Sequence, residues 1–136
     1  MSIVYLALGS NLGERLQYIQ KAVDELEASG VKVLKLSTII ETDPVGGPAQ
    51  GKYLNAVLKA STDHSPEELH EITLGVERKL GRVKKVVNGP RIIDIDILLY
   101  DDIKLITPKL LIPHPRMFER DFVMGPLKEI APELIN

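Results

Sequence analysis

The sequence predicts an α+β domain in which an antiparallel sheet is covered by helices on one face. Short apolar runs of strand length alternate with two stretches whose apolar residues recur at helical spacing. Their order is strand, helix, two strands, helix, strand, which is the βαββαβ order of the ferredoxin-like fold. Glycine and proline punctuate the connections. The other face of such a sheet would be covered by loops and could hold ligands.

The first strand and helix occupy residues 3–30. Residues 3–8 form an apolar run ending at Gly9, which is typical of a buried strand. Ser10 or Asn11 is expected to cap the following helix, and Gly30 to end it. The apolar stripe of this helix comprises Leu12, Leu16, Ile19, Val23 and Leu26. The segment 9–13 lacks the Gly-Lys-Ser/Thr ending of a P-loop, so we interpret it as a capping turn.

The next two strands are predicted at residues 31–40 and 53–60, with turn-forming residues at 42–48 between them. The first of these strands is rich in β-branched residues. In the second strand, one face carries Tyr53, Asn55 and Val57, and the other face carries Leu54, Ala56, Leu58 and Ala60.

The second helix has a strong start signal. Ser65 is a typical cap, Pro66 occupies the first helical position, and Glu68 stands three residues after the cap. Gly81 is expected to terminate the helix. The buried stripe comprises Leu69, Ile72, Val76 and Leu80.

The remaining segments are a basic loop at 82–91, a last clear strand at 92–100 and a short helix near 118–128. No repeat, low-complexity tract or linker divides the chain, so residues 1–136 are expected to form a single domain.

Composition excludes several classes of function. The chain is 44% hydrophobic and 26% charged, as in globular proteins, and its net charge of −2 does not suggest nucleic-acid binding. The absence of cysteine excludes disulfides, thiolate metal sites and a cysteine nucleophile. No apolar run approaches the ~20 residues of a membrane span, and the first residues lack signal-peptide features. We therefore expect a cytoplasmic protein.

Asp94 and Asp96 alternate with isoleucines in the last strand, so both carboxylates face the same side. They are separated by roughly 6.6 Å along the strand, and so can converge on one ion or bridge two. Hard oxygen ligands without a nearby thiolate favour magnesium. The alternative is a half-exposed strand whose aspartates simply face water.

The basic loop before this strand supplies Arg82, Lys84, Lys85 and Arg91. Arginine can bind phosphate through two parallel hydrogen bonds, and lysine acts as a point charge. Basic side chains could close over phosphates held by magnesium at the strand, which is what phosphoryl transfer requires. A solvated surface cluster is the alternative interpretation.

The histidines carry less information. His64 and His70 are interpreted as surface residues without a role. His114 lies between two prolines, where a ligand contact and a structural hydrogen bond are about equally plausible.

Five segments in order closely resemble the 6-hydroxymethyl-7,8-dihydropterin pyrophosphokinase family. These segments are Gly9–Gly13, Tyr53–Asn55, Gly89–Asp96, Pro113–Met117 and Glu119–Phe122. Each is weak alone, but the ordered set covers nearly the whole chain and is highly specific.

The resemblance implies transfer of a pyrophosphoryl group from ATP to the pterin hydroxymethyl oxygen, releasing AMP. It implies a monomer acting on small molecules, with two Mg²⁺ ions at Asp94 and Asp96. The implied pterin contacts are Thr42, Pro44, Val45, Tyr53, Asn55 and Phe122. The implied nucleotide contacts are Glu77, Arg82, Lys84, Arg91, Ile97, Lys109, His114 and Arg120. Arg82 and Arg91 would also be catalytic, beside the two aspartates.

Some positions depart from the family pattern. Asn88 stands where a tryptophan is usual, Val87 replaces a common basic residue, and Leu74 and Leu111 occupy positions that are often polar. The chain also ends at Asn136, short of a tail that many members carry. These changes concern rate and affinity more than reaction type.

Two other functions are compatible with the pattern. The fold alone would suit a non-catalytic module that binds a ligand or RNA on its open sheet face, although such RNA-binding faces display aromatics. Aromatic residues make up only 4% of this chain. A nucleotide-sugar transferase could also use two such aspartates, but the chain is short for two substrate domains.

Overall fold

The computed structural model describes residues 1–44, 50–81 and 92–134. Its main sheet is antiparallel, with strand order β2-β4-β1-β5 and β3 also paired to β4. The strands are β1 (Ser2–Ser10), β2 (Val31–Leu36), β3 (Ile40–Thr42), β4 (Tyr53–Thr62) and β5 (Asp94–Tyr100). A small separate hairpin is formed by β6 (Leu105–Ile106) and β7 (Leu111–Ile112).

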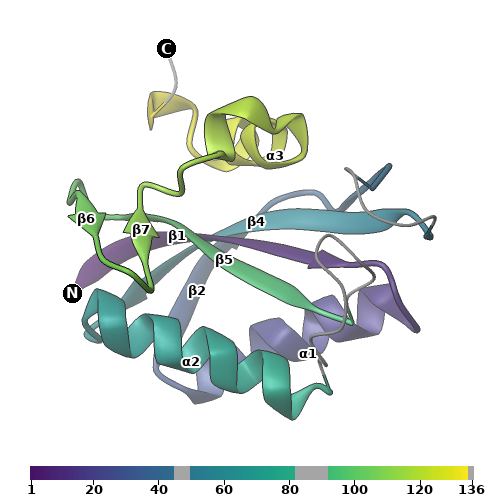
Figure 1. Ribbon diagram of the computed structural model, residues 1–136, viewed down its shortest axis with the longest axis horizontal. Helices are drawn as coiled ribbons and strands as arrows, with labels where there is room; N and C mark the ends of the chain where they lie inside the picture. Colours follow the sequence, from purple (N-terminus) through teal and green to yellow (C-terminus); the bar gives the residue numbers. More distant parts are fainter. Residues whose placement is uncertain (45–49, 82–91, 135–136) are drawn as a thin grey trace.

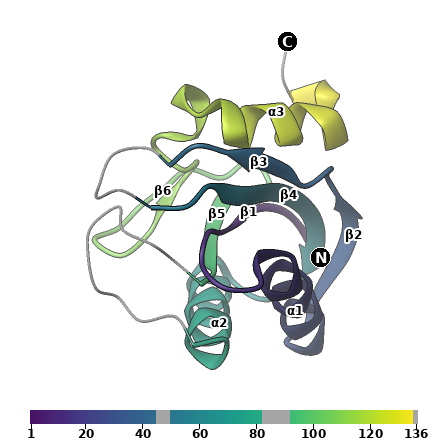
Figure 2. The ribbon, with the colours of Figure 1, turned by 90° about the vertical axis from the view of Figure 1, so that its right-hand side faces the viewer.

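The helices lie on both faces of the sheet. They are α1 (Arg15–Ala28), α2 (Pro66–Lys79) and α3 (Asp121–Ile130), with short 3-10 turns η1 (Met117–Glu119) and η2 (Pro132–Leu134). Figures 1 and 2 show α1 and α2 side by side under one face and α3 across the other. The predicted ferredoxin-like fold is confirmed, but loops alone do not cover the second face.

That second face needs a cover because strand residues there are apolar. Tyr5, Val57 and Leu98 point away from α1 and α2 and pack against Val123 and Leu127 of α3. Burying such side chains is the main favourable term in folding. The C-terminal helix therefore closes part of the face and leaves the rest for a ligand.

The larger core lies between the sheet and the first two helices. Leu6 of β1, Leu58 of β4 and Ile95 of β5 pack there against Ile19 of α1 and Leu69 of α2. The predicted alternation in β4 is confirmed, since its two faces contribute to different cores.

The two main helices begin in different ways. Ser65 and Glu68 form the predicted capping box at the start of α2. The predicted cap of α1 is wrong, because Ser10 belongs to β1 and the Asn11 amide binds Gln50 and Gly51 instead. The helix starts only at Arg15, without a side-chain cap.

This late start changes the apolar stripe of α1. Leu12 precedes the helix, and Leu12 and Leu16 are both exposed. Ile19 and Leu26 are fully buried, as predicted. The helices α1 and α2 are each followed by a glycine at positive φ, Gly30 and Gly81, which also fits the prediction.

The single strand predicted at 31–40 is wrong, because it is divided at Ser37. The backbone N–H of Ser37 donates to the Val57 carbonyl, while its hydroxyl accepts the Val57 N–H at 2.9 Å. A side chain therefore replaces a backbone carbonyl in the ladder, and the chain turns into β3.

Near the C-terminus, the predicted helix at 118–128 is instead η1 followed by α3, with Arg120 between them in an extended conformation. The last strand begins at Asp94, two residues later than predicted. None of the helices formed by the described residues is long and apolar enough to cross a membrane.

Candidate active site

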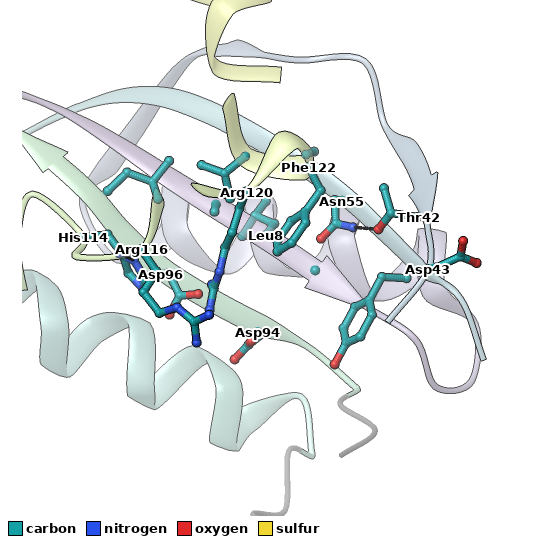
Figure 3. Close-up of a pocket in the computed structure, with 16 residues that line it drawn as sticks. Leu8, Thr42, Asp43, Asn55, Asp94, Asp96, His114, Arg116, Arg120 and Phe122 are labelled. Atoms are coloured by element: carbon teal, nitrogen blue, oxygen red, sulfur yellow. Dashed lines mark hydrogen bonds between the residues drawn. The ribbon is translucent and has the colours of Figure 1, made fainter. Parts of the chain in front are cut away.

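A pocket lies on the α3 side of the sheet, beside the segment that leads from β7 into α3 (Figure 3). The residues that line it are Ala7, Leu8, Gly9, Thr42, Asp43, Tyr53, Asn55, Ala56, Asp94, Asp96, Leu98, His114, Arg116, Arg120, Phe122 and Val123. Strands provide its base and the β7–α3 segment provides one wall. It thus combines an apolar part with a strongly charged part.

The register of three strands arranges the base of the pocket. Asn55 of β4 lies opposite Gly9 of β1, and Gly9 lies opposite Asp94 of β5. In the next row on this face, Ala7 lies opposite Asp96. Since neighbouring strands are ~4.8 Å apart, the backbones at Asn55 and Asp94 are about 10 Å apart. Only small residues stand between these polar groups, so the sheet is hollowed there.

Gly9 is required by this packing. A Cβ at position 9 would lie 3.0 Å from Asn55 Oδ1 and 3.4 Å from Tyr53 Cδ1. The first distance is shorter than ordinary van der Waals contact, so the asparagine would have to move. The absence of a side chain therefore creates the space and fixes how close its walls stand.

The walls near Asn55 suit a flat polar ring. Asn55 is 7% exposed, and its amide nitrogen donates to the Thr42 hydroxyl, which orients the amide. Phe122 is half-buried and lies next to Asn55 (Figure 3). An aromatic face with a fixed amide at its edge can hold a heterocycle and read its hydrogen-bonding pattern.

Asp94 and Asp96 occupy the charged part of the pocket. Both are half-buried on the same face of β5, and Arg120 extends beside them (Figure 3). The Arg120 guanidinium also lies 5.6 Å from the centre of the Phe122 ring. Arg120 thus connects the apolar and acidic parts of the pocket.

The imidazole of His114 stands between several charges. Its Nδ1 accepts the Arg116 backbone N–H at 3.3 Å, so a neutral ring carries its proton on Nε2. Burial lowers the pKa of His114 below its usual value, and the positive charge of Arg120 lowers it further. Asp94 opposes these effects, while Arg116 adds to them. The His114 imidazole is therefore harder to protonate than a free histidine side chain.

A second pocket adjoins the first. Asp96 and His114 line both pockets, so they stand at the junction. Ile97 and Lys109, which the resemblance assigns to the nucleotide, line the second pocket. His70 of α2, which we interpreted from the sequence as a surface residue without a role, also lines it.

Several predicted site residues are not brought to the pockets. Pro44 is half-buried but lines neither pocket. Glu77 is 3% exposed on α2, and its carboxylate accepts the Ile95 backbone N–H at 2.8 Å beneath β5. The predicted contacts Val45, Arg82, Lys84 and Arg91 lie outside the described residues, as do Lys85, Val87 and Asn88.

Sequence reasoning missed Ala7, Gly9, Asp43 and Arg116 as lining residues. Ala7 and Gly9 matter through strand register, which joins residues far apart in the chain. In the sequence, Arg116 was indicated only by its place in the motif Pro113–Met117, two residues after His114.

The chemistry of the donor set fits a magnesium ion shared with a ligand. Within residues 1–44, 50–81 and 92–134, no group of three or more His, Asp or Glu side chains is arranged to hold a metal. Magnesium is commonly held by one or two carboxylates together with substrate phosphates and water. Two aspartates beside an open pocket match that arrangement.

Comparison with known proteins gives a consistent result. The model of the 7,8-dihydro-6-hydroxymethylpterin-pyrophosphokinase (HPPK) family matches residues 5–132. The 2-amino-4-hydroxy-6-hydroxymethyldihydropteridine pyrophosphokinase of Bacillus subtilis is 46% identical over 134 residues, covering 98% of this chain and 80% of that protein. The enzyme of the same name from Aquifex aeolicus is 46% identical over 136 residues, covering 100% of this chain and 84% of its own length.

A solved structure supports the fold. Plasmodium falciparum HPPK-DHPS, crystallised with pteroate, superposes with a TM-score of 0.74 at 14% identity. The match covers 94% of this chain but only 38% of that longer polypeptide. The family model and the two bacterial relatives extend over nearly the whole chain. The chain therefore belongs to the 7,8-dihydro-6-hydroxymethylpterin-pyrophosphokinase family.

Proposed function

We propose that this protein transfers a pyrophosphoryl group from ATP to the hydroxymethyl oxygen of 6-hydroxymethyl-7,8-dihydropterin, releasing AMP, in folate biosynthesis. The observation that carries the proposal is the row formed by Asn55, Gly9 and Asp94 across three strands. It puts a group that can read a heterocycle and a group that can hold a metal about 10 Å apart. A two-ring substrate bearing a hydroxymethyl group can span such a distance.

In this proposal the pterin lies over Gly9, against Phe122 and Tyr53. The amide of Asn55, oriented by Thr42, would recognise its polar edge. The resemblance also assigns Pro44 and Val45 to the pterin, although Pro44 lines neither pocket in the structure. The hydroxymethyl group would then point toward Asp94. Binding in this orientation would lower the barrier by holding the acceptor oxygen near the phosphates.

Asp94 and Asp96 would hold two magnesium ions. When bound, the ions would neutralise charge on the phosphates and polarise the pterin hydroxyl. Ile97, Lys109 and His114 would contact the nucleotide, with Glu77 close by under β5.

Arginines would neutralise the charge that develops on the transferred group. Arg120 lines the same pocket as the two aspartates, and its guanidinium lies 5.6 Å from the centre of the Phe122 ring. Arg82 and Arg91, together with Lys84, would add further positive charge from the basic loop.

The alternative of an RNA-binding module has less support. Such modules present an open sheet face with stacking aromatics. Here α3 packs on part of that face, and the open remainder carries two aspartates that repel phosphate unless metal is present.

We further propose that the protein acts as a monomer in the cytoplasm, since its substrates are small soluble molecules; light scattering would check its mass.

The decisive assay incubates the protein with ATP, magnesium and 6-hydroxymethyl-7,8-dihydropterin and separates the nucleotides by chromatography. We expect AMP to form only when the pterin is present. Formation of ADP, or no nucleotide turnover at all, would refute the proposal.

A further inference from the structure

Arg116 is a second arginine on the acidic side of the pocket. It lies between His114 and η1, and its backbone N–H donates to His114 Nδ1. The next residue, Met117, is 1% exposed and packs in the core beneath α3. The backbone at position 116 is therefore fixed from both sides, although the side chain itself is 63% exposed.

The side chain of Arg116 lines the same pocket as Asp94 and Asp96. Figure 3 shows it next to His114 and on the same side as Arg120. Arg116 and Arg120 thus provide two guanidinium groups from one short segment. Both belong to the residues that the structure describes.

We propose that Arg116 is a phosphate-binding residue, whose guanidinium donates hydrogen bonds to the polyphosphate chain held at Asp94 and Asp96. The inference rests on the proposed function and extends it to a residue outside the resemblance-based assignments. A planar guanidinium can bind two phosphate oxygens at once. Together with Arg120 it would place positive charge on the α3 side of the phosphates.

Glu119 forms an ion pair with the side chain of Arg116. Its carboxylate lies 3.5 Å from Arg116 Nε, and both side chains are mostly exposed. An exposed ion pair of this kind is weak and screened by salt, so a polyphosphate of higher charge can displace it. Glu119 thus competes with the phosphate for the guanidinium.

The test compares Arg116→Ala, Arg116→Lys and Glu119→Gln with the charge-matched control Arg78→Ala. Arg78 is exposed at the end of α2 and lines neither pocket. We expect Arg116→Ala to lower kcat/KM for ATP about tenfold, the value of one charge-assisted hydrogen bond. Arg116→Lys should lower kcat/KM for ATP by a smaller factor, because lysine keeps the positive charge but lacks the paired N–H donors of a guanidinium.

Glu119→Gln should lower the KM for ATP about twofold, since it frees the guanidinium. Arg78→Ala should match the wild type. If Arg116→Ala stays within twofold of Arg78→Ala, the role of Arg116 is refuted. A raised KM in Glu119→Gln refutes the competition.

A second measurement keeps this result separate from the proposed function. Calorimetry with inorganic tripolyphosphate and magnesium reports the phosphate site without a pterin or a nucleotide. Weaker binding by Arg116→Ala, again about tenfold relative to Arg78→Ala, supports the inference even if the wild type makes no AMP. Equal binding by the two variants overturns it, even if the wild type is an active pyrophosphokinase.

Discussion

Asp96 borders both pockets, so its carboxylate is central to the proposed chemistry. Asp96→Ala should lower pterin-dependent AMP formation by at least about 100-fold, because a major source of charge stabilisation is lost. The melting temperature should change little, since the residue is half-buried at the pocket edge and not in the core. Asp102→Ala, an exposed change just after β5, is the matched control. An active Asp96→Ala protein would contradict the proposed role of Asp96 in holding magnesium.

Gly9 separates the two functional halves of the pocket. In Gly9→Ala the new methyl group would meet Asn55 Oδ1 at 3.0 Å, so the asparagine must shift away from its position. We expect the KM for the pterin to rise about tenfold or more while the KM for ATP stays nearly unchanged. Steady-state kinetics with each substrate varied in turn provides the measurement.

The control for this change is Gly75→Ala. An added Cβ at Gly75, within α2, meets nothing within 4 Å. It should leave both KM values unaltered and stabilise the helix by up to about 1 kcal/mol. An equal rise of pterin KM in both variants would contradict the packing role of Gly9.

His114 gives a pH dependence of known sign. Its folded pKa is lowered by burial and by Arg120, so the unfolded chain binds a proton first as the pH falls. The resulting loss of stability begins near pH 6.5, the unfolded pKa, and is complete below the lowered folded pKa. Denaturation experiments on the wild type and His114→Asn between pH 7.5 and pH 5 measure the part of this loss that comes from His114. NMR titration should show a folded pKa below 6.5; a value above 6.5 would contradict the assignment.

At this scale the sequence predicted the residues whose chemistry is distinctive. The two aspartates, Asn55 and Tyr53 were singled out by alternation and by the motif set, and all of them line the pocket. Ala7 could not be found in this way, and Gly9, although it opens the motif Gly9–Gly13, was interpreted only as part of a capping turn. They act by being small at a point where three strands meet, and the register that brings them there is a long-range property.

At the scale of elements, Ser37 decides where one strand ends and the next begins. Its buried hydroxyl accepts the Val57 N–H and donates to the Thr38 carbonyl. Ser37→Ala should lower the free energy of unfolding by about 1–3 kcal/mol, because the Val57 N–H is left without a partner. Urea denaturation measures this loss. Thr107→Ala, a loss of a hydroxyl on the β6–β7 hairpin, is a comparison outside the main sheet.

Contacts between distant parts of the chain explain why some predicted element boundaries were wrong. The start of α2 was predictable because Ser65 and Glu68 satisfy the first turn locally. The break at Ser37 and the start of α1 depend on partners 20 or more residues away, namely Val57 for Ser37 and residues 50–51 for Asn11. Periodicity detects local chemistry, so it missed both.

At the scale of the whole molecule, two hydrophobic cores share one sheet. Leu6 and Leu58 point to one core, while their neighbours Tyr5 and Val57 point to the other. The two cores therefore cannot separate without disrupting the same strands. We expect α3 and the rest of the domain to unfold together, which also means that the pocket forms only in the complete fold.

Leu127→Ala tests this coupling. Leu127 is 1% exposed on α3, and its truncation should cost about 2–5 kcal/mol through lost burial and a cavity. Far-UV circular dichroism and tyrosine fluorescence should still report one shared transition at lower temperature, because Tyr5 of β1 lies in the same core. Leu134→Ala, at a half-exposed position in η2, should change stability by less than about 0.5 kcal/mol. An early fluorescence change that leaves most of the circular dichroism intact would show that α3 docks as an independent unit.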